Sequence, residues 1–209
     1  FVDAHGKQQT GQLAIKGTID LVTEVDDDTI EVIDWKTGRR LNWATGEKKT
    51  YEKLSSHILK TPVIEGWSLI NDILNTNIIF KMEFLQHSGT FKTRGAINNI
   101  LNLNTSQKTS GITAVSAGNH AIAASYAANK FKLRNKIFIY NSANVFRVKK
   151  CQSLNANLVF TDPHNAFTQV TRASKEEGYY FIHPFDGIFT LQGTASLGFE
   201  ICKQVDKID

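Results

Sequence analysis

The sequence predicts an α/β fold: a mainly parallel, three-layer sheet, incomplete within the 209 residues and preceded by a small β-hairpin-rich segment. Two observations predict it. From about residue 78, short apolar stretches alternate with longer helical ones, which is the pattern of a parallel sheet covered by helices on both faces. Before residue 40, apolar and polar residues alternate one by one, as in strands with one exposed face.

The first predicted elements are two strands, at residues 12–25 (QLAIKGTIDLVTEV) and 29–36 (TIEVIDWK). The aspartates at 26–28 form a polar connection that is typical of a hairpin, and Thr37 and Gly38 end the second strand.

The rest of the chain is predicted to alternate between strands and helices. The candidate strands are 78–84, 111–116, 136–140, 158–161 and 179–183, and the candidate helices are 94–103, 120–131, 145–155 and 166–177. The pattern changes between residues 48 and 57, so we divide the chain into residues 1–54 and 55–209.

Composition and charge exclude few functions. No run approaches the roughly 20 apolar residues of a membrane-spanning helix, and no secretory signal is visible, so we expect a cytoplasmic protein with no membrane partner. The net charge of +4 fits small anionic ligands as well as nucleic acid. Cys151 and Cys202 are expected to be reduced thiols, although a disulfide stays open.

The stretch KMEFLQHSGTFKTRGA, at residues 81–96, places Lys92 on a loop between a predicted strand and a predicted helix. Loops at this edge of an α/β sheet hold ligands. A nucleophilic lysine must be partly neutral, and a semi-enclosed loop beside Phe91 would supply the desolvation. A solvated surface lysine is the alternative interpretation.

The stretch SAGNH, at residues 116–120, lies between a predicted strand and a helix rich in small residues. Backbone N–H groups at such a helix start form a natural carboxylate site, and Gly118 lets the backbone approach a ligand. Asn119 could alternatively be a helix N-cap. His120 is not expected to bind a metal, because no second ligand stands at helical spacing from it.

Together these runs resemble the motifs of fold-type II pyridoxal-phosphate enzymes of the threonine dehydratase and serine racemase type. The resemblance covers about residues 57–209 and extends to TPV at 61–63 and HPFDGIFTLQGTASLGFE at 183–200. In the lysine motif the matching positions are Glu83, Gln86, Ser88, Gly89, Thr90, Phe91, Lys92, Arg94, Gly95 and Ala96.

The resemblance implies a pyridoxal 5'-phosphate-dependent ammonia-lyase that converts L-threonine or L-serine to a 2-oxo acid and ammonia. It makes Lys92 the covalent anchor of the cofactor and the general base, and it places Phe91 and Asn119 against the cofactor ring. The residues implied to bind the carboxylate of the small amino-acid substrate are Ser116, Gly118, Asn119 and His120. Ala117 stands where serine racemases carry a serine acid, which favours dehydration over racemisation.

In this family a glycine-rich phosphate loop follows the region that the 209 residues cover. We therefore expect weak cofactor binding and impaired activity, since a phosphate dianion without its N–H donors binds poorly. No metal is expected in residues 55–209. The choice between threonine and serine and the formation of a homo-oligomer stay open.

A second resemblance concerns Asp20, Asp34 and Lys36 in GTIDLV and IEVIDWKTGR, which are similar to the core of the PD-(D/E)xK nucleases of the RecB-like group. Two carboxylates would bind Mg²⁺ and the lysine would be catalytic, which implies an exonuclease fragment acting on nucleic acid. Since the two halves resemble unrelated enzymes, a catalytically inert chimeric α/β module is a third alternative.

Overall fold

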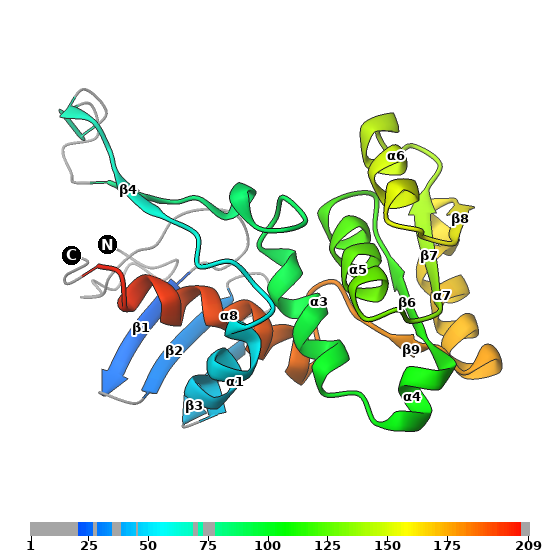
Figure 1. The fold of residues 1–209 in the computed structure, drawn as a ribbon, viewed down its shortest axis with the longest axis horizontal. Helices are drawn as coiled ribbons and strands as arrows, with labels where there is room; N and C mark the ends of the chain where they lie inside the picture. Colours follow the sequence, from blue (N-terminus) through cyan, green and yellow to red (C-terminus); the bar gives the residue numbers. More distant parts are fainter. Residues whose placement is uncertain are drawn as a thin grey trace.

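The first described elements form a separate antiparallel sheet. A computed structural model describes residues 21–26, 29–34, 39–44, 46–68, 71–72 and 78–205, with side chains from residue 49 onward. The strands β1 (Leu21–Asp26), β2 (Thr29–Asp34) and β3 (Arg39–Ala44) lie in that order, each antiparallel to the next (Figure 1). The predicted hairpin is therefore confirmed where the chain is described, and β3 was not predicted.

The parallel sheet predicted for the second part of the chain is confirmed. Its strands are β6 (Ile112–Val115), β7 (Asn135–Tyr140), β8 (Leu158–Thr161) and β9 (Tyr180–Phe181). They lie in the order β8-β7-β6-β9, and every neighbouring pair is parallel.

Helices cover both faces of this sheet (Figure 1). The helices α5 (Asn119–Lys130) and α6 (Val145–Ser153) lie on one face, and α7 (Pro163–Glu177) lies on the other. Successive residues of a strand point to opposite faces. Accordingly, Ile137 packs into the core on the α5 side, whereas its neighbour Phe138 packs into the core against α7.

The strand predicted at 78–84 is only partly correct. The strand β5 (Ile79–Lys81) pairs with β4 (Val63–Glu65) and not with the parallel sheet. A short 3-10 turn, η1 (Glu83–Leu85), follows, because the Leu85 N–H bonds back to the Met82 carbonyl. The chain thus leaves the strand before the lysine motif begins.

Four further elements complete the described chain: α1 (Gly46–Ser55), α3 (Lys92–Leu101), α4 (Thr105–Ser110) and α8 (Ile188–Cys202). Of these, only α3 was predicted. The sequence of α8, IFTLQGTASLGFEIC, contains glycines, threonines and β-branched residues of low helix propensity. Burial against the rest of the fold, which local sequence does not report, therefore decides its structure.

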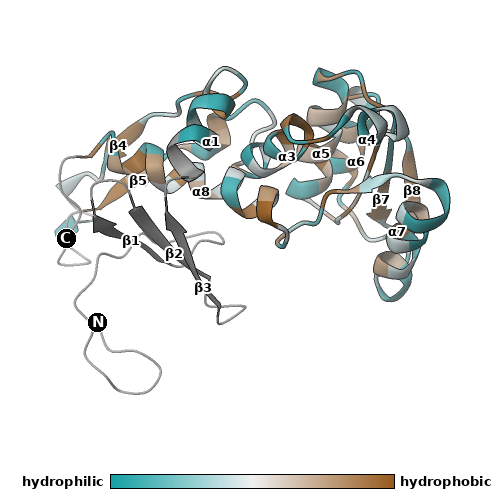
Figure 2. Cartoon of the chain, turned by 90° about the horizontal axis from the view of Figure 1, so that it is seen from below, coloured by the Kyte–Doolittle hydropathy of each residue, from teal (hydrophilic) through white to brown (hydrophobic). Residues whose placement is uncertain are grey.

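Helix α1 runs across the boundary that we predicted between residues 54 and 55. It lies beside α8 in both Figure 1 and Figure 2, and Leu54 is fully buried in the main hydrophobic core. The described end of α1 therefore packs with the second part of the chain, while the boundary itself stays a prediction. Cys151 and Cys202 are both reduced and are not joined in a disulfide.

The helices α3 and α8 cross at two glycines. A Cβ atom on Gly193 would lie 2.5 Å from the Arg94 carbonyl oxygen and 2.8 Å from the Gly95 Cα atom. A Cβ atom on Gly95 would lie 3.1 Å from the carbonyl oxygen of Thr190. The two backbones are therefore in direct contact, and this contact determines how the start of α3 lies relative to α8.

We expect Gly193→Ala to destabilise the protein by about 3 kcal/mol, because the backbone of α3 must move to admit the methyl group. Gln192→Ala on the same helix is the control and should change stability by less than about 1 kcal/mol. Urea unfolding of the three proteins measures the effect. Equal unfolding free energies for Gly193→Ala and the parent would contradict the close crossing.

Candidate functional site

Two side chains from different helices bind the segment that follows β9. Lys92 Nζ donates a hydrogen bond of 2.7 Å to the Pro184 carbonyl, and His120 Nε2 lies 2.9 Å from the Ile182 carbonyl. Lys92 is the first residue of α3 and His120 the second residue of α5. The structure therefore brings Lys92 and the 116–120 loop to the same short segment.

We predicted that Lys92 lies on a loop, but it is the first residue of α3. Phe91 precedes it without any side-chain cap, and the first turn is instead held by Thr93, whose hydroxyl donates to the Thr90 carbonyl over 2.7 Å and contacts the Ser88 hydroxyl. The Lys92 ammonium lies 5.1 Å from the centroid of the Phe91 ring, within the range of a cation–π contact. The side chain of Lys92 is half-buried, so the solvated surface lysine is not what the structure shows.

His120 is buried, and its environment keeps it neutral. Burial, and to a smaller extent the positive charges of Lys92 and His183, lowers the pKa of His120 to about 4, against an opposing hydrogen bond to Ile182. Because a carbonyl can only accept, Nε2 must carry the proton. Nδ1 is therefore unprotonated at neutral pH.

The 116–120 loop is held by its own side chains. The Gly118 N–H donates to Ser116 Oγ over 3.0 Å, and Gly118 takes the N-cap position of α5. Asn119 is the first residue of the helix and is exposed, so the alternative that Asn119 is the N-cap is wrong. A Cβ atom on Gly118 would lie 2.8 Å from Arg147 Nη1, so the guanidinium of Arg147 rests against this loop.

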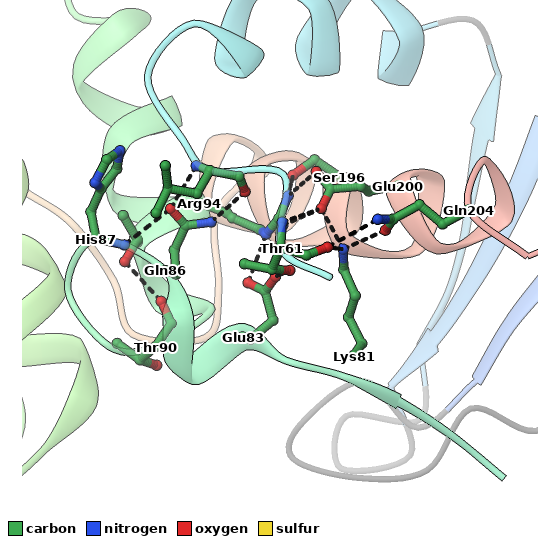
Figure 3. A network of polar contacts seen from close by, with 12 residues as sticks. Thr61, Lys81, Glu83, Gln86, His87, Thr90, Arg94, Ser196, Glu200 and Gln204 are labelled. Atoms are coloured by element: carbon green, nitrogen blue, oxygen red, sulfur yellow. Dashed lines mark hydrogen bonds and ion pairs between the residues drawn. The ribbon is translucent and has the colours of Figure 1, made fainter. Parts of the chain in front are cut away.

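Near this site lies a buried cluster of four charges, which we name the ion cluster: Lys81, Glu83, Arg94 and Glu200 (Figure 3). Arg94 has no exposed side-chain surface and binds both carboxylates through paired hydrogen bonds. Its bonds to Glu83 measure 2.7 and 2.8 Å, and those to Glu200 measure 3.0 and 3.2 Å. Such bidentate pairs combine strength with a defined orientation.

Lys81, Thr61 and Tyr51 also donate hydrogen bonds to the two carboxylates. Lys81 Nζ donates to Glu200 and to the Thr61 carbonyl over 2.5 and 2.6 Å, and the Thr61 hydroxyl donates to Glu83 over 2.5 Å. Burial alone would raise the pKa of Glu200, but the hydrogen bonds from Arg94 and Lys81 hold it below its ordinary value. Glu200 is therefore ionised at neutral pH.

His183, which precedes Pro184, packs against three phenylalanine rings. The His183 ring lies 4.6 Å from Phe185, 5.3 Å from Phe181 and 5.6 Å from Phe167, measured between centroids. Burial lowers the pKa of His183, which the nearby Asp186 partly opposes. We name Phe167, Phe181, His183 and Phe185 the aromatic cluster.

Sequence reasoning missed the part of the site formed by Pro184, Arg147 and the aromatic cluster. A signal for Pro184 and His183 was present, since the HPFD run at 183–186 carries part of the resemblance, but no role was assigned to it. Nothing in the sequence signals Arg147, because its contact with Gly118 depends on how α6 packs beside α5.

Of the residues in the nuclease resemblance, Asp34 ends β2, while Asp20 and Lys36 lie outside the described residues. Within the part of the chain that the structure describes, no group of three or more His, Cys, Asp or Glu residues could hold a metal ion. Among the same residues, no helix is long and apolar enough to cross a bilayer.

Comparisons with known proteins concern the second part of the chain. Residues 54–209 match the family described as "Pyridoxal-phosphate dependent enzyme". The chain is 39% identical over 158 residues to the phenylserine dehydratase of Ralstonia pickettii, covering 75% of this chain and 48% of that protein. It is 30% identical over 163 residues to the L-threonine ammonia-lyase of Thermotoga maritima, covering 77% of this chain and 41% of that protein.

Among solved structures, maize serine racemase is similar with a TM-score of 0.73 and 27% identity, covering 78% of this chain and 50% of that one. The chain thus spans about half the length of the curated relatives it matches. The matched family model begins only at residue 54, and the comparisons lend no support to the nuclease resemblance.

We expect the stability of the protein to fall in mild acid because of His120. Between its ordinary pKa of 6.5 and the folded value of about 4, the unfolded chain binds more protons than the folded one, so stability decreases as the pH falls through this range. The loss amounts to about 3 kcal/mol at about 1.4 kcal/mol per pH unit.

Urea unfolding between pH 7 and pH 4 measures this loss, with His120→Gln as the control, since glutamine can donate to Ile182 without titrating. The unfolding free energies of the variant and the parent should converge as the pH falls. If the unfolding free energies of the variant and the parent change in parallel over this pH range, His120 is not buried in its neutral form.

Proposed function

The chain belongs to the family of pyridoxal-phosphate-dependent enzymes, and on this basis we propose that it deaminates β-hydroxy amino acids such as L-threonine and L-serine to 2-oxo acids and ammonia. The observation that carries the proposal is the half-buried amine of Lys92, held on the Pro184 carbonyl beside a neutral imidazole. An amine in such a position is suited to covalent chemistry with a carbonyl compound.

The described residues fit the family's cofactor, which is an aromatic aldehyde. Lys92 offers a primary amine for the aldehyde carbon, and Phe91 offers an aromatic ring beside that amine. Asn119 offers an exposed amide that can donate to a ring hydroxyl. When bound, this cofactor supplies the electron sink that makes the Cα–H bond of an amino acid acidic.

Lys92 has two roles in this proposal. Its amine would hold the cofactor covalently, and the same amine would accept the proton from the substrate Cα atom. His120 is neutral, so it adds no positive charge beside the Lys92 amine. The Pro184 carbonyl orients the amine by accepting its hydrogen bond.

The 116–120 loop binds the substrate carboxylate in this proposal. Ser116 and Gly118 shape the loop, the first turn of α5 provides backbone N–H donors, and Arg147 adds a positive charge against it. Ala117 has no proton to deliver to the opposite face of Cα, so we assign a lyase and not a racemase.

A second candidate substrate carries an aromatic β-substituent, as in phenylserine. The Ralstonia pickettii relative is a phenylserine dehydratase, and the aromatic cluster lies directly beside the Pro184 segment that holds Lys92. Rings prefer edge-to-face and tilted contacts such as those within this cluster, so a substrate phenyl group would find suitable partners there.

Titration with pyridoxal phosphate should produce an absorbance band in the visible that Lys92→Ala abolishes, because the band requires the covalent bond to this amine. Lys203→Ala is the matched control, since Lys203 also contacts a phenylalanine ring, Phe199, at 4.6 Å. Release of 2-oxo acid from L-threonine, L-serine and phenylserine then ranks the substrates. A protein that shows neither the absorbance band nor release of 2-oxo acid would favour the catalytically inert α/β module.

Arg147→Ala should raise the KM for the amino acid about tenfold with little change in kcat, as expected for the loss of one charged hydrogen bond to the carboxylate. Steady-state kinetics measure both constants. Lys149→Ala, an exposed cation on the same helix, is the control. A KM for Arg147→Ala equal to that of the parent would remove Arg147 from the site.

A further inference from the structure

We propose that the ion cluster is a positioning device for Lys92: it fixes the start of α3 against α8 so that the amine stays on the Pro184 carbonyl. The inference rests on the proposed function, which makes Lys92 the reactive group. Glu83, Arg94 and Glu200 are then positioning residues, and none of them needs to touch the substrate or the cofactor.

The energetics of buried charges argue against a role in stability alone. The two cations and two carboxylates balance, but all four are largely removed from water, Arg94 and Glu200 almost completely. Desolvation of such charges offsets much of their attraction, and well-packed apolar residues often stabilise a core as well or better. What the cluster adds is a defined geometry, since two bidentate pairs allow Arg94 only one orientation.

The position of Arg94 links this geometry to the amine. Arg94 is the third residue of α3 and Lys92 is the first, so both belong to the same helical turn. Phe91 gives that turn no side-chain cap. The turn is held instead by Thr90, whose hydroxyl accepts a hydrogen bond from the Lys92 N–H, by Thr93 and by Arg94.

The carbonyl that accepts the hydrogen bond of the Lys92 amine lies just before α8, the helix that carries Glu200. Pro184 lies four residues before the start of α8 at Ile188, and Glu200 lies near the opposite end of the same helix. Since α3 and α8 touch at Gly95 and Gly193, a rotation of one helix about this crossing would separate the Lys92 amine from Pro184. Arg94 prevents such a rotation by binding Glu200.

The experiment measures the reactivity of Lys92 in the cofactor-free protein. Brief labelling with acetic anhydride, followed by mass spectrometry, gives the acetylation rate of each lysine at a temperature well below the melting midpoint. Glu200→Gln and Glu83→Gln should each increase the rate at Lys92 about fivefold, the equivalent of one net hydrogen bond lost by the amine.

Two controls separate positioning from general loosening. Lys53, which α1 holds on the Leu101 carbonyl at the far end of α3, should keep its rate in the same variants. Glu176→Gln breaks an exposed ion pair with Arg172 and should leave Lys92 unchanged. If Glu200→Gln and Glu83→Gln lower the melting temperature while Lys92 reacts at the parent rate, the ion cluster is only structural and the inference is wrong.

A milder variant covers the case in which the charge variants do not fold. Thr61→Val removes the single hydrogen bond to Glu83 while keeping the side-chain shape, and it should raise the Lys92 rate about twofold. No change in this rate would overturn the inference. Because the labelling needs no cofactor or substrate, an absent lyase activity would count against the proposed function and leave the result on positioning intact.

Discussion

The burial of one guanidinium between two carboxylates is the constraint on which the second part of the chain depends. Arg94 joins Glu83, in the turn after β5, to Glu200, near the end of α8. These segments lie more than a hundred residues apart, and a buried cation left without either partner would carry a large desolvation penalty. The fold is therefore closed by a polar contact as well as by its apolar core.

This arrangement divides the residues of the lysine motif into two groups. Lys92 binds the segment that follows β9, whereas Glu83 and Arg94 belong to the ion cluster. Residues of one continuous sequence motif therefore lie in two different parts of the structure. Two of the matching positions, Glu83 and Arg94, therefore belong to a buried ion cluster and not to the site that we propose around Lys92.

The sequence predicted the strands of the parallel sheet well, because a strand buried on both faces, such as β6, appears as a short apolar run. It also predicted β8, at the edge of the sheet, with its observed bounds. It did not predict α8, whose helix depends on contact with α3, or the helical start at Lys92, which Thr93 and Arg94 hold from within the fold. In the candidate site, Lys92 and the 116–120 loop could be named in advance. Arg147 could not, and no role could be given to Pro184, since the contacts of both residues arise only from tertiary packing.

The contact between Gly118 and Arg147 has a consequence for how this site can diverge. A larger residue at 118 would displace the guanidinium of Arg147, so the two positions influence each other. Relatives that carry alanine or serine at 118 should therefore carry a shorter side chain at 147, or one turned toward solvent. Paired substitutions at positions 118 and 147 would then distinguish the relatives that keep this arginine beside the loop from those that do not.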